Sequence, residues 1–463
     1  MRFIARFAKD MKDYYEVSTV YDENIVKEKI DKKEAFLRSI AKRYPAAVWF
    51  ERKISDDFGI TIKDTFDNRT LFKHERFPKG IFPLRKDFDQ KEINFSNDYR
   101  EYKYERVSGD SVFEVSVGPI HAGIIEPGHF HFSQAGEDIL HLEVRHFYKY
   151  RAIEKMLEGK TLFEAKKIIE KISGNESVAY QIAWRDIVCK SCDFELDERL
   201  KIQHAFLLEL ERLIHHLTDL GFIPNDAGFS SALAYASKMA EDSRRVMKKI
   251  TSHRFGFGGI DFTIKEFDKE YLNKFLLNLE DEMKFFEDWI LDIPSLWDRF
   301  DTTGILTKDE AKIYSCVGVV ARASGIEVDR RNDGFYQDFG YQMITENKGD
   351  VASRFKVRLY EVFNSITMMK NFLNIDFSIN KQLNEITDNI NANDGEYISF
   401  CESSIGELFM YIFIKNGVID RFFVRDPSFI NWQALHLMMP NNIIADFPLI
   451  NKSCDLSYAG NDL

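Results

Sequence analysis

A short stretch between two predicted strands concentrates residue types that move protons. In "GPIHAGIIEPGHFHF" four such side chains fall within eleven positions: His121, Glu126, His129 and His131. An imidazole titrates near neutral pH, and a carboxyl group can be tuned toward it, so the stretch could relay protons. The alternative is a polar hairpin tip whose side chains are satisfied by backbone hydrogen bonds. Spacing alone leaves both interpretations open.

A second candidate group lies on one face of a predicted helix. In "ELERLIHHLTDLG" the residues Glu211, His215 and Asp219 recur every four positions, which places them on a single helix face. If that face is buried, its titratable groups could pass protons along the helix. The same spacing is equally expected of a polar face that binds neighbouring helices.

Two other motifs favour structure over chemistry. Cys189 and Cys192 form the one Cys-x-x-Cys pair in the sequence, but no second pair of metal ligands stands at a matching spacing. We therefore interpret this pair as structural. The run Gly256, Gly258 and Gly259 follows no predicted strand and precedes no Gly-Lys-Ser/Thr, so a nucleotide-binding loop is not expected.

The composition is that of a large acidic chain able to bury extensive cores. It has 463 residues, 44% of them hydrophobic, and a net charge of -12, so a basic face for nucleic acid is not expected. Five cysteines are few and odd in number, which favours a reducing compartment over a disulfide scaffold. The longest apolar run, "LFMYIFI", is far shorter than the roughly 20 residues that cross a bilayer. We expect a soluble chain that reaches a membrane only through partners.

The residue patterns predict an α+β fold in two parts. Residues 1–95 mix helical patterns with strand-like runs, "AAVWFERKI" and "GITIKD", and predict a small α+β domain. Residues 96–463 predict a mainly helical bundle with β-hairpins at its rim, because apolar residues recur at three- and four-residue spacing from about residue 148. Alternation returns over 396–425, where Asn416-Gly417 predicts the turn of a hairpin.

A series of short motifs in a fixed order gives the chain a family resemblance. The motifs include "GPIHAGIIEPGHF", "TSHRFGFGGI", "GDVASRFKVRLYE", "ESSIGELFMYI" and the final "SCDLSYAGNDL". Together they resemble the large subunit of energy-converting, membrane-bound NiFe hydrogenases and its homologue in respiratory complex I. Upstream, "WFERKISDDFGI" and "FPLRKDF" resemble the small, 30 kDa-type complex I subunit, here fused into one chain. The resemblance implies a hydrogenase large-subunit fold behind a small fused domain.

The resemblance also implies that a nickel site has been lost. Active hydrogenases of this family hold nickel and iron with two Cys-x-x-Cys pairs, whose thiolates suit these metals. In family register Ser173 and Glu176 stand at the first pair, and Ser457 and Gly460 at the second. Serine does not readily ionise and glycine has no side chain, so no metal is expected on this chain. Cys454 lies three residues before the second pair and does not replace it in that register.

Further site residues are implied by the same resemblance. His121 matches the first of two complex I histidines, while Ile125 stands at the second, and Gly174 stands where complex I has a quinone-contacting tyrosine. His121 and Glu126 are expected to face one cavity, with Glu126 exchanging protons there from a raised pKa. The residues expected near a partner's iron–sulfur cluster or in a proton relay are His131, His253, Arg254 and Glu211.

The function implied by the resemblance is that of a subunit in a membrane-associated, ion-translocating oxidoreductase. No cofactor is expected on this chain; an iron–sulfur cluster would lie in a small partner subunit, a quinone is one candidate acceptor, and any NAD would bind elsewhere in the complex. Antiporter-like and quinone-channel-like membrane subunits would hold the chain on the cytoplasmic side of the inner membrane. The alternatives are a non-catalytic scaffold of such a complex and, less favoured, an active hydrogenase.

Overall fold

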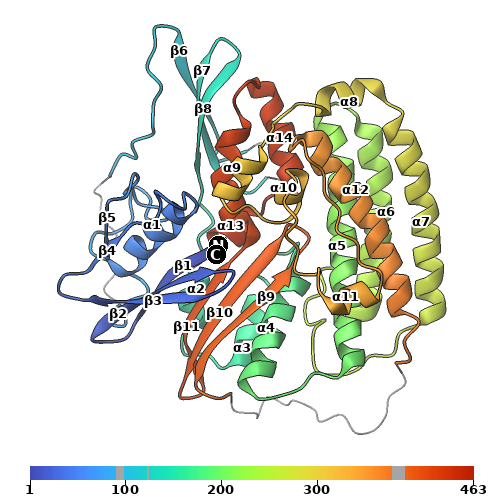
Figure 1. Ribbon diagram of the computed structural model, residues 1–463, viewed down its shortest axis with the longest axis horizontal. Helices are drawn as coiled ribbons and strands as arrows, with labels where there is room; N and C mark the ends of the chain where they lie inside the picture. Colours follow the sequence, from blue (N-terminus) through green and yellow to red (C-terminus); the bar gives the residue numbers. More distant parts are fainter. Residues whose placement is uncertain (90–98, 122–124, 378–391) are drawn as a thin grey trace.

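The chain folds into a sheet-rich half and a helical half that lie side by side (Figure 1). A computed structural model describes residues 1–89, 99–121, 125–377 and 392–463. The predicted α+β class is confirmed, with a small N-terminal unit, a helical bundle and β-hairpins beside it. The predicted domain boundary near residue 95 lies outside the described residues and stays a prediction.

The N-terminal unit combines two small sheets with one helix. The antiparallel sheet has the order β1-β2-β3, and β4 pairs in parallel with β5, which "GITIKD" predicted. The run "AAVWFERKI" was predicted wrongly as a strand and forms helix α1. The neighbours Trp49 and Phe50 are both buried, although they would point to opposite faces of a strand, and Phe50, Ile54 and Phe58 recur every four residues on the buried side of the helix. The elements are β1 (Phe3–Asp10), β2 (Tyr14–Tyr21), β3 (Ile25–Asp31), β4 (Phe36–Arg38), α1 (Ala47–Phe58) and β5 (Thr61–Lys63).

The N-terminal unit shares a core with the rest of the chain. Phe7 of β1 stacks on Phe423 with ring centroids 4.4 Å apart and contacts Tyr411 at 4.5 Å. Arg2 forms an ion pair with Glu407, at 2.7 Å, across the same junction. Apolar and ionic contacts therefore fasten the fused unit to the C-terminal sheet.

Two three-stranded antiparallel sheets form the rim of the bundle. The first has the order β6-β7-β8 and the second β11-β10-β9. The predicted turn at Asn416-Gly417 is confirmed: both residues have positive φ, 54° and 74°, as a tight hairpin turn requires. The strands are β6 (Val112–Val117), β7 (His129–Ala135), β8 (Asp138–Arg145), β9 (Gly395–Glu402), β10 (Glu407–Lys415) and β11 (Val418–Arg425).

The helical half is built around α5, which packs on α6 and α12 (Figure 1). Periodic apolar residues bury one face of α7, as the sequence predicted, and one face of α6, whereas α4, α5 and α12 are buried over most of their residues. The long helices are α4 (Ser177–Ser191), α5 (Glu198–Asp226), α6 (Ser230–Thr251), α7 (Lys269–Leu291) and α12 (Val351–Phe372). In the parts of the chain that the structure describes, we find no helix that is both long and apolar enough to span a membrane.

Short helices connect these elements and close the C-terminus. Between β8 and α12 they are α2 (Ile153–Leu157), α3 (Leu162–Ile169), α8 (Pro294–Phe300), α9 (Lys308–Ile313), α10 (Gly318–Ala323) and α11 (Gly334–Asp338). After β11 come α13 (Pro427–Asn431), the 3-10 helices η2 (Trp432–Met438) and η3 (Ile444–Asp446), α14 (Phe447–Cys454) and α15 (Tyr458–Asp462). Helices α13 and α15 contact each other, which brings the end of the chain to the start of α13.

Candidate functional site

The two segments that carry the predicted ligand positions meet in the fold. The hydroxyl oxygens of Ser173 and Ser457 lie 3.2 Å apart, although 284 positions separate them in the sequence. Ser173 precedes α4, and Ser457 is the N-cap of α15, where its Oγ accepts a hydrogen bond from the amide of Gly460 at 2.9 Å. The two segments therefore lie close together, as expected. The prediction that these positions held metal ligands in an ancestral protein stays a prediction.

A carboxylate fills the space that a side chain at position 460 would need. A Cβ built on Gly460 would lie 2.0 Å from Oδ2 of Asp426, far inside van der Waals contact. Asp426 caps α13 by accepting the amide of Ser428 at 2.8 Å, and it accepts the hydroxyl of Tyr180 at 2.7 Å. These bonds hold Asp426 where a side chain at position 460 would lie.

Glu176 is the second acidic group of this cluster and is fully buried. The hydroxyl of Ser403 donates to its carboxyl oxygen at 2.5 Å. Burial first, and then the nearby charge of Asp426, raise the pKa of Glu176 well above its usual range. Burial also raises the pKa of Asp426, but hydrogen bonds from Tyr180 and Ser428 oppose this rise. Burial thus favours the protonated form of both groups, and the hydrogen bonds from Tyr180 and Ser428 favour the charge on Asp426.

These donors do not fit a nickel–iron centre. Two serine hydroxyls, a carboxyl group and a glycine offer no soft anionic ligand. A thiolate at position 460 would also have to displace the carboxylate of Asp426 from its bonds to Tyr180 and Ser428. We derive no chemistry through a metal at this cluster.

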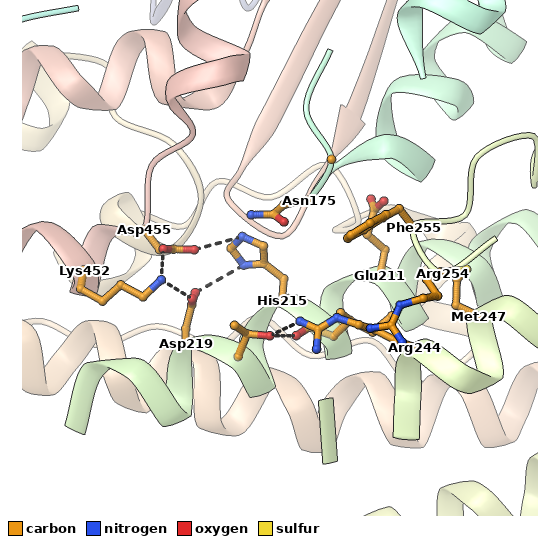
Figure 2. Close-up of a pocket in the computed structure, with 13 residues that line it drawn as sticks. Asn175, Glu211, His215, Asp219, Arg244, Met247, Arg254, Phe255, Lys452 and Asp455 are labelled. Atoms are coloured by element: carbon orange, nitrogen blue, oxygen red, sulfur yellow. Dashed lines mark hydrogen bonds and ion pairs between the residues drawn. The ribbon is translucent and has the colours of Figure 1, made fainter. Parts of the chain in front are cut away.

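A pocket of about 530 Å³ opens to solvent beside the cluster (Figure 2). Glu211, His215 and Asp219 all line it, as their predicted common face of one helix requires, and they come from α5. Asn175, next to the buried Glu176, also lines the pocket. Its remaining lining residues are Gly174, Ile214, Thr218, Arg244, Met247, Arg254, Phe255, Lys452 and Asp455.

Glu211 connects the pocket to the buried cluster. Its carboxyl oxygens accept the amides of Val178 at 2.6 Å and Ala179 at 3.1 Å, at the start of α4. Burial raises the pKa of Glu211 to about 8 in spite of these two bonds. The charge on Glu211 also contributes to the raised pKa of Glu176. A proton taken up at the pocket can thus influence the protonation of the cluster behind it.

His215 sits between two carboxylates at one end of the pocket (Figure 2). Its Nδ1 is 3.3 Å from Asp219 and its Nε2 is 3.1 Å from Asp455. Lys452 forms ion pairs with both carboxylates. Burial alone would raise the pKa of Asp219, but His215, Lys452 and Arg358 together hold it well below its usual range. This end of the pocket is a closed network of compensating charges.

His215, His216 and Asp219 are close enough in the fold to act as ligands of one metal ion. However, Asp219 already holds Arg358 at 2.8 Å, and His216 pairs with Glu361 at 2.8 Å. A cation at this point would meet the charges of Arg358 and Lys452. The arrangement therefore favours a structural ion-pair network over a metal site.

His121 and Glu126 do not line the pocket. Nε2 of His121 donates to the carbonyl of Gly128 at 2.8 Å, which is the self-satisfied hairpin tip that the sequence left open. Glu126 forms an ion pair with Lys149, and its second oxygen accepts the amide of Ala459 at 3.0 Å. A lysine partner favours the charged carboxylate, so the environment differs from the apolar burial we expected. Glu126 still touches α15, one residue from Gly460.

His129 and His131 lie together on β7 under a tyrosine. Tyr104 stacks on His131 with ring centroids 4.3 Å apart, and its hydroxyl lies 2.6 Å from Nδ1 of His129. Burial, followed by the charges of His131 and Arg145, lowers the pKa of His129 to about 4. His131 contacts Glu114 through Nε2 at 3.0 Å. The predicted role of His131 beside a partner's cluster is not tested by these contacts.

His253 and Arg254 lie at the turn after α6. Arg254 makes two hydrogen bonds of 2.7 Å to Glu241 and lines the pocket. His253 stacks on Phe257 with ring centroids 4.3 Å apart. The structure thus brings Arg254 to the same pocket as Glu211. The expected proximity of His253 and Arg254 to an iron–sulfur cluster of a partner subunit stays a prediction.

The motifs interpreted as structural have structural environments. Burial raises the pKa of the Cys189 thiol to about 11, and it also raises the pKa of Cys192. Such thiols are poor nucleophiles and poor metal ligands at neutral pH. In the glycine run, the amide of Gly258 donates to Glu170 of the chain itself at 2.7 Å. That amide is thereby engaged by a protein carboxylate.

Sequence reasoning missed three residues of the cluster and several of the pocket, among them Arg244. Asp426 stands in "RDPSF", where Asp followed by Pro and Ser predicts the start of a helix. This pattern predicts that Asp426 caps the helix, but it does not predict the contact between Asp426 and Gly460. Tyr180, Ser403 and Arg244 stand in ordinary helix or loop sequence. Only the tertiary contacts reveal them.

Comparisons with known proteins place the chain among components of redox complexes. Residues 226–378 and 377–462 match the family described as "Respiratory-chain NADH dehydrogenase, 49 Kd subunit", and residues 5–94 match the corresponding 30 Kd subunit. Formate hydrogenlyase subunit 5 of Escherichia coli is 28% identical over 94% of this chain and 79% of its own length. A subunit of the F(420)H(2) dehydrogenase of Methanosarcina mazei is 30% identical over 74% of this chain and 95% of its own length. A chain in the structure of a membrane-bound sulfane sulfur reductase, an archaeal respiratory complex, shares the fold with a TM-score of 0.70 and 18% identity, over 76% of this chain and 99% of that one.

Proposed function

Because this chain belongs to the family of the 49 Kd subunit of respiratory-chain NADH dehydrogenase, we propose that it is the catalytic-type subunit of a membrane-associated, ion-translocating oxidoreductase without nickel. Its relatives are named as subunits of hydrogenases and dehydrogenases, which supports an oxidoreductase complex. In this proposal an acidic, hydrogen-bonded cluster occupies the place of the lost metal.

The observation that carries the proposal is the carboxylate of Asp426 at the missing side chain of Gly460. A metal site that had only lost its ligands would leave an empty cavity or polar groups without hydrogen-bond partners. Here the space is taken by a buried acid pair, Glu176 and Asp426, with hydrogen bonds from Ser403 and Tyr180. Buried acid pairs that share a proton are suited to taking up charge without a metal.

The proposed role of the acid cluster is to bind a proton when electrons arrive nearby. An iron–sulfur small subunit would deliver electrons to the edge of the cluster, as the family implies. Added negative charge raises the proton affinity of Asp426, and Glu211 at the pocket, with a pKa of about 8, is placed to supply the proton. Antiporter-like and quinone-channel-like membrane subunits would couple the change in charge to ion movement and hold the chain on the cytoplasmic side of the membrane.

The acceptor is the open part of this proposal. A quinone is one candidate, because the family includes NADH-quinone oxidoreductase subunits. In the pocket, however, Gly174 supplies no aromatic ring at the position where complex I has a quinone-contacting tyrosine. A second candidate function is a non-catalytic scaffold, which is favoured by Ile125 and Gly174 at the positions where the family resemblance expects residues that contact quinone.

The metal content of the purified protein tests the central claim. We expect less than about 0.1 nickel per chain by elemental analysis, with no hydrogen uptake, because no soft ligand remains. A relative that retains the four cysteines, purified in parallel, is the positive control. One nickel per chain together with hydrogen uptake would show that the ligand register is wrong.

A substitution in the acid pair separates the catalytic proposal from the scaffold. Asp426→Asn keeps the shape and can still accept a hydrogen bond from Tyr180 or Ser428, while it removes the carboxylate that takes up the proton. We expect the assembled complex to lose electron-transfer activity at least about tenfold, in line with the loss of one general acid, while assembly continues. Full activity in this variant would support the scaffold.

A further inference from the structure

Within the described parts of the chain, one basic group of the pocket has no acidic partner at ion-pair distance. This group is the guanidinium of Arg244. Among the described residues, it makes one hydrogen bond, to Oγ1 of Thr218 at 2.8 Å (Figure 2). The nearest acid in its surroundings, Glu241, is already bound by Arg254 and Arg245. A guanidinium has five N–H donors, so most of the hydrogen-bonding capacity of Arg244 is unused.

Burial makes this arrangement costly unless a ligand completes it. Arg244 is half-buried, and burial lowers its pKa, because the nearby Glu241 does not fully compensate the desolvation. Its neighbour Arg245, by contrast, is exposed and forms ion pairs with Glu241 and Asp242. The pocket-facing arginine is therefore left without the partner that the solvent-facing arginine has.

Arg244 is the cation lining the pocket whose charge no described carboxylate pairs. The other cations of the lining are paired: Arg254 binds Glu241, and Lys452 forms ion pairs with Asp219 and Asp455. Burial raises the pKa of Glu211 to about 8, which disfavours its charged form. Arg358, behind the wall, binds Asp219 as well. An anion that enters the pocket therefore meets the unpaired charge of Arg244.

The remaining walls limit the size of the ligand. Met247 and Phe255 give the pocket an apolar side, and Asn175 and Gly174 stand at its exposed rim (Figure 2). The amide of Asn175 adds a second polar group that can bind an oxyanion. The volume of about 530 Å³ includes the open mouth, so the enclosed part suits a compact ligand.

We propose that this pocket binds a small oxyanion, held by the guanidinium of Arg244 next to the buried acid cluster. The ligand is a compact inorganic oxyanion or a short carboxylate, since both present the paired oxygens that a guanidinium binds in bidentate fashion. The inference deepens the proposed function in one respect, because it names the class of ligand, a small anion, that binds beside the acid cluster. Binding itself requires no electron transfer and can be measured separately.

The test is a binding titration on the full chain at low ionic strength. Sulfate and thiosulfate serve as tetrahedral dianions of the same charge, and formate serves as a small carboxylate; each is titrated by calorimetry. Arg244→Gln removes the guanidinium, and Arg245→Gln is the matched control, because it removes the same charge from the adjacent, exposed position. Near-UV circular dichroism checks that all variants are folded, and Arg244→Lys keeps the charge while it removes the fork of donors.

The expected result is saturable binding of at least one probe, weakened at least about tenfold by Arg244→Gln and less than about twofold by Arg245→Gln. Arg244→Lys should fall between the two. Preference for sulfate and thiosulfate over formate would identify an inorganic oxyanion site, and the reverse preference a carboxylate site. Equal weakening by both glutamine variants, or no saturable binding of any probe, would overturn the proposal. A chain that binds anions but contains stoichiometric nickel would overturn the proposed function and leave the anion site standing.

Discussion

Replacing Gly460 with alanine should destabilise the folded chain far more than its size suggests. The new methyl group would lie 2.0 Å from Oδ2 of Asp426, so either the carboxylate or helix α15 must move. Asp426 cannot move without loosening its hydrogen bonds to Tyr180 at 2.7 Å and to the amide of Ser428 at 2.8 Å. The substitution therefore tests whether the acid cluster is built around the missing side chain.

The cost can be worked out from those contacts. A hydrogen bond to a charged group contributes about 1.5–3 kcal/mol, and loss of a helix cap costs about 1 kcal/mol. Alanine in place of glycine within a helix returns up to about 1 kcal/mol through its higher helix propensity. Since overpacking in a rigid interior costs about 1–3 kcal/mol more, we expect a net loss of about 2.5–6 kcal/mol. That is a large part of the roughly 5–15 kcal/mol by which domains are stable.

Urea unfolding of the purified chain measures this loss, with Gly174→Ala as the control. Gly174 lies beside the same cluster, yet a Cβ there would meet no atom within 4 Å. Adding Asp426→Ala to Gly460→Ala makes room for the methyl group, so in that background the Gly460 substitution should cost less than about 0.5 kcal/mol. The reasoning fails if Gly460→Ala costs no more than Gly174→Ala, or if its cost is the same with and without the Asp426 carboxylate.

Two further predictions concern groups with shifted pKa values. Because burial raises the pKa of Glu211 from 4.5 to about 8, the folded chain keeps a proton that the unfolded chain loses, and stability from this group declines as pH rises from about 4.5 to 8. The free energy of unfolding in urea, measured at pH 5.5 and 8, should fall less with pH in Glu211→Gln than in the unsubstituted chain, whereas the exposed Glu195→Gln should leave the fall unchanged. An equal fall in Glu211→Gln and in the unsubstituted chain would contradict the raised pKa of Glu211. The Cys189 thiol, with its pKa raised to about 11, should alkylate at pH 7.5 at least about tenfold more slowly than an unhindered thiol, and rapid joint oxidation with Cys192 would instead indicate a redox pair.

Local patterns sufficed for most elements of the fold. The long helices α5, α7 and α12 followed from apolar spacing, and the β10–β11 hairpin followed from Asn416-Gly417. Helix α1 did not, because "AAVWFERKI" has the aromatic and β-branched content of a strand. Its burial against β1 decides in favour of a helix, and that contact is not encoded within the run itself.

The sequence by itself predicted which residues stand at the ligand positions of the family and that Glu211, His215 and Asp219 share a helix face. Both predictions need no knowledge of long-range contacts. Only the tertiary structure decided which groups surround Gly460. Asp426 contacts Gly460 and Tyr180 because α13, α15 and α4 converge from three distant segments of the chain. Among the described residues, Arg244 lacks a carboxylate partner because Glu241 forms its ion pair with Arg254. Whether a polar group is paired or unpaired depends on neighbours in space, so no local pattern can reveal it.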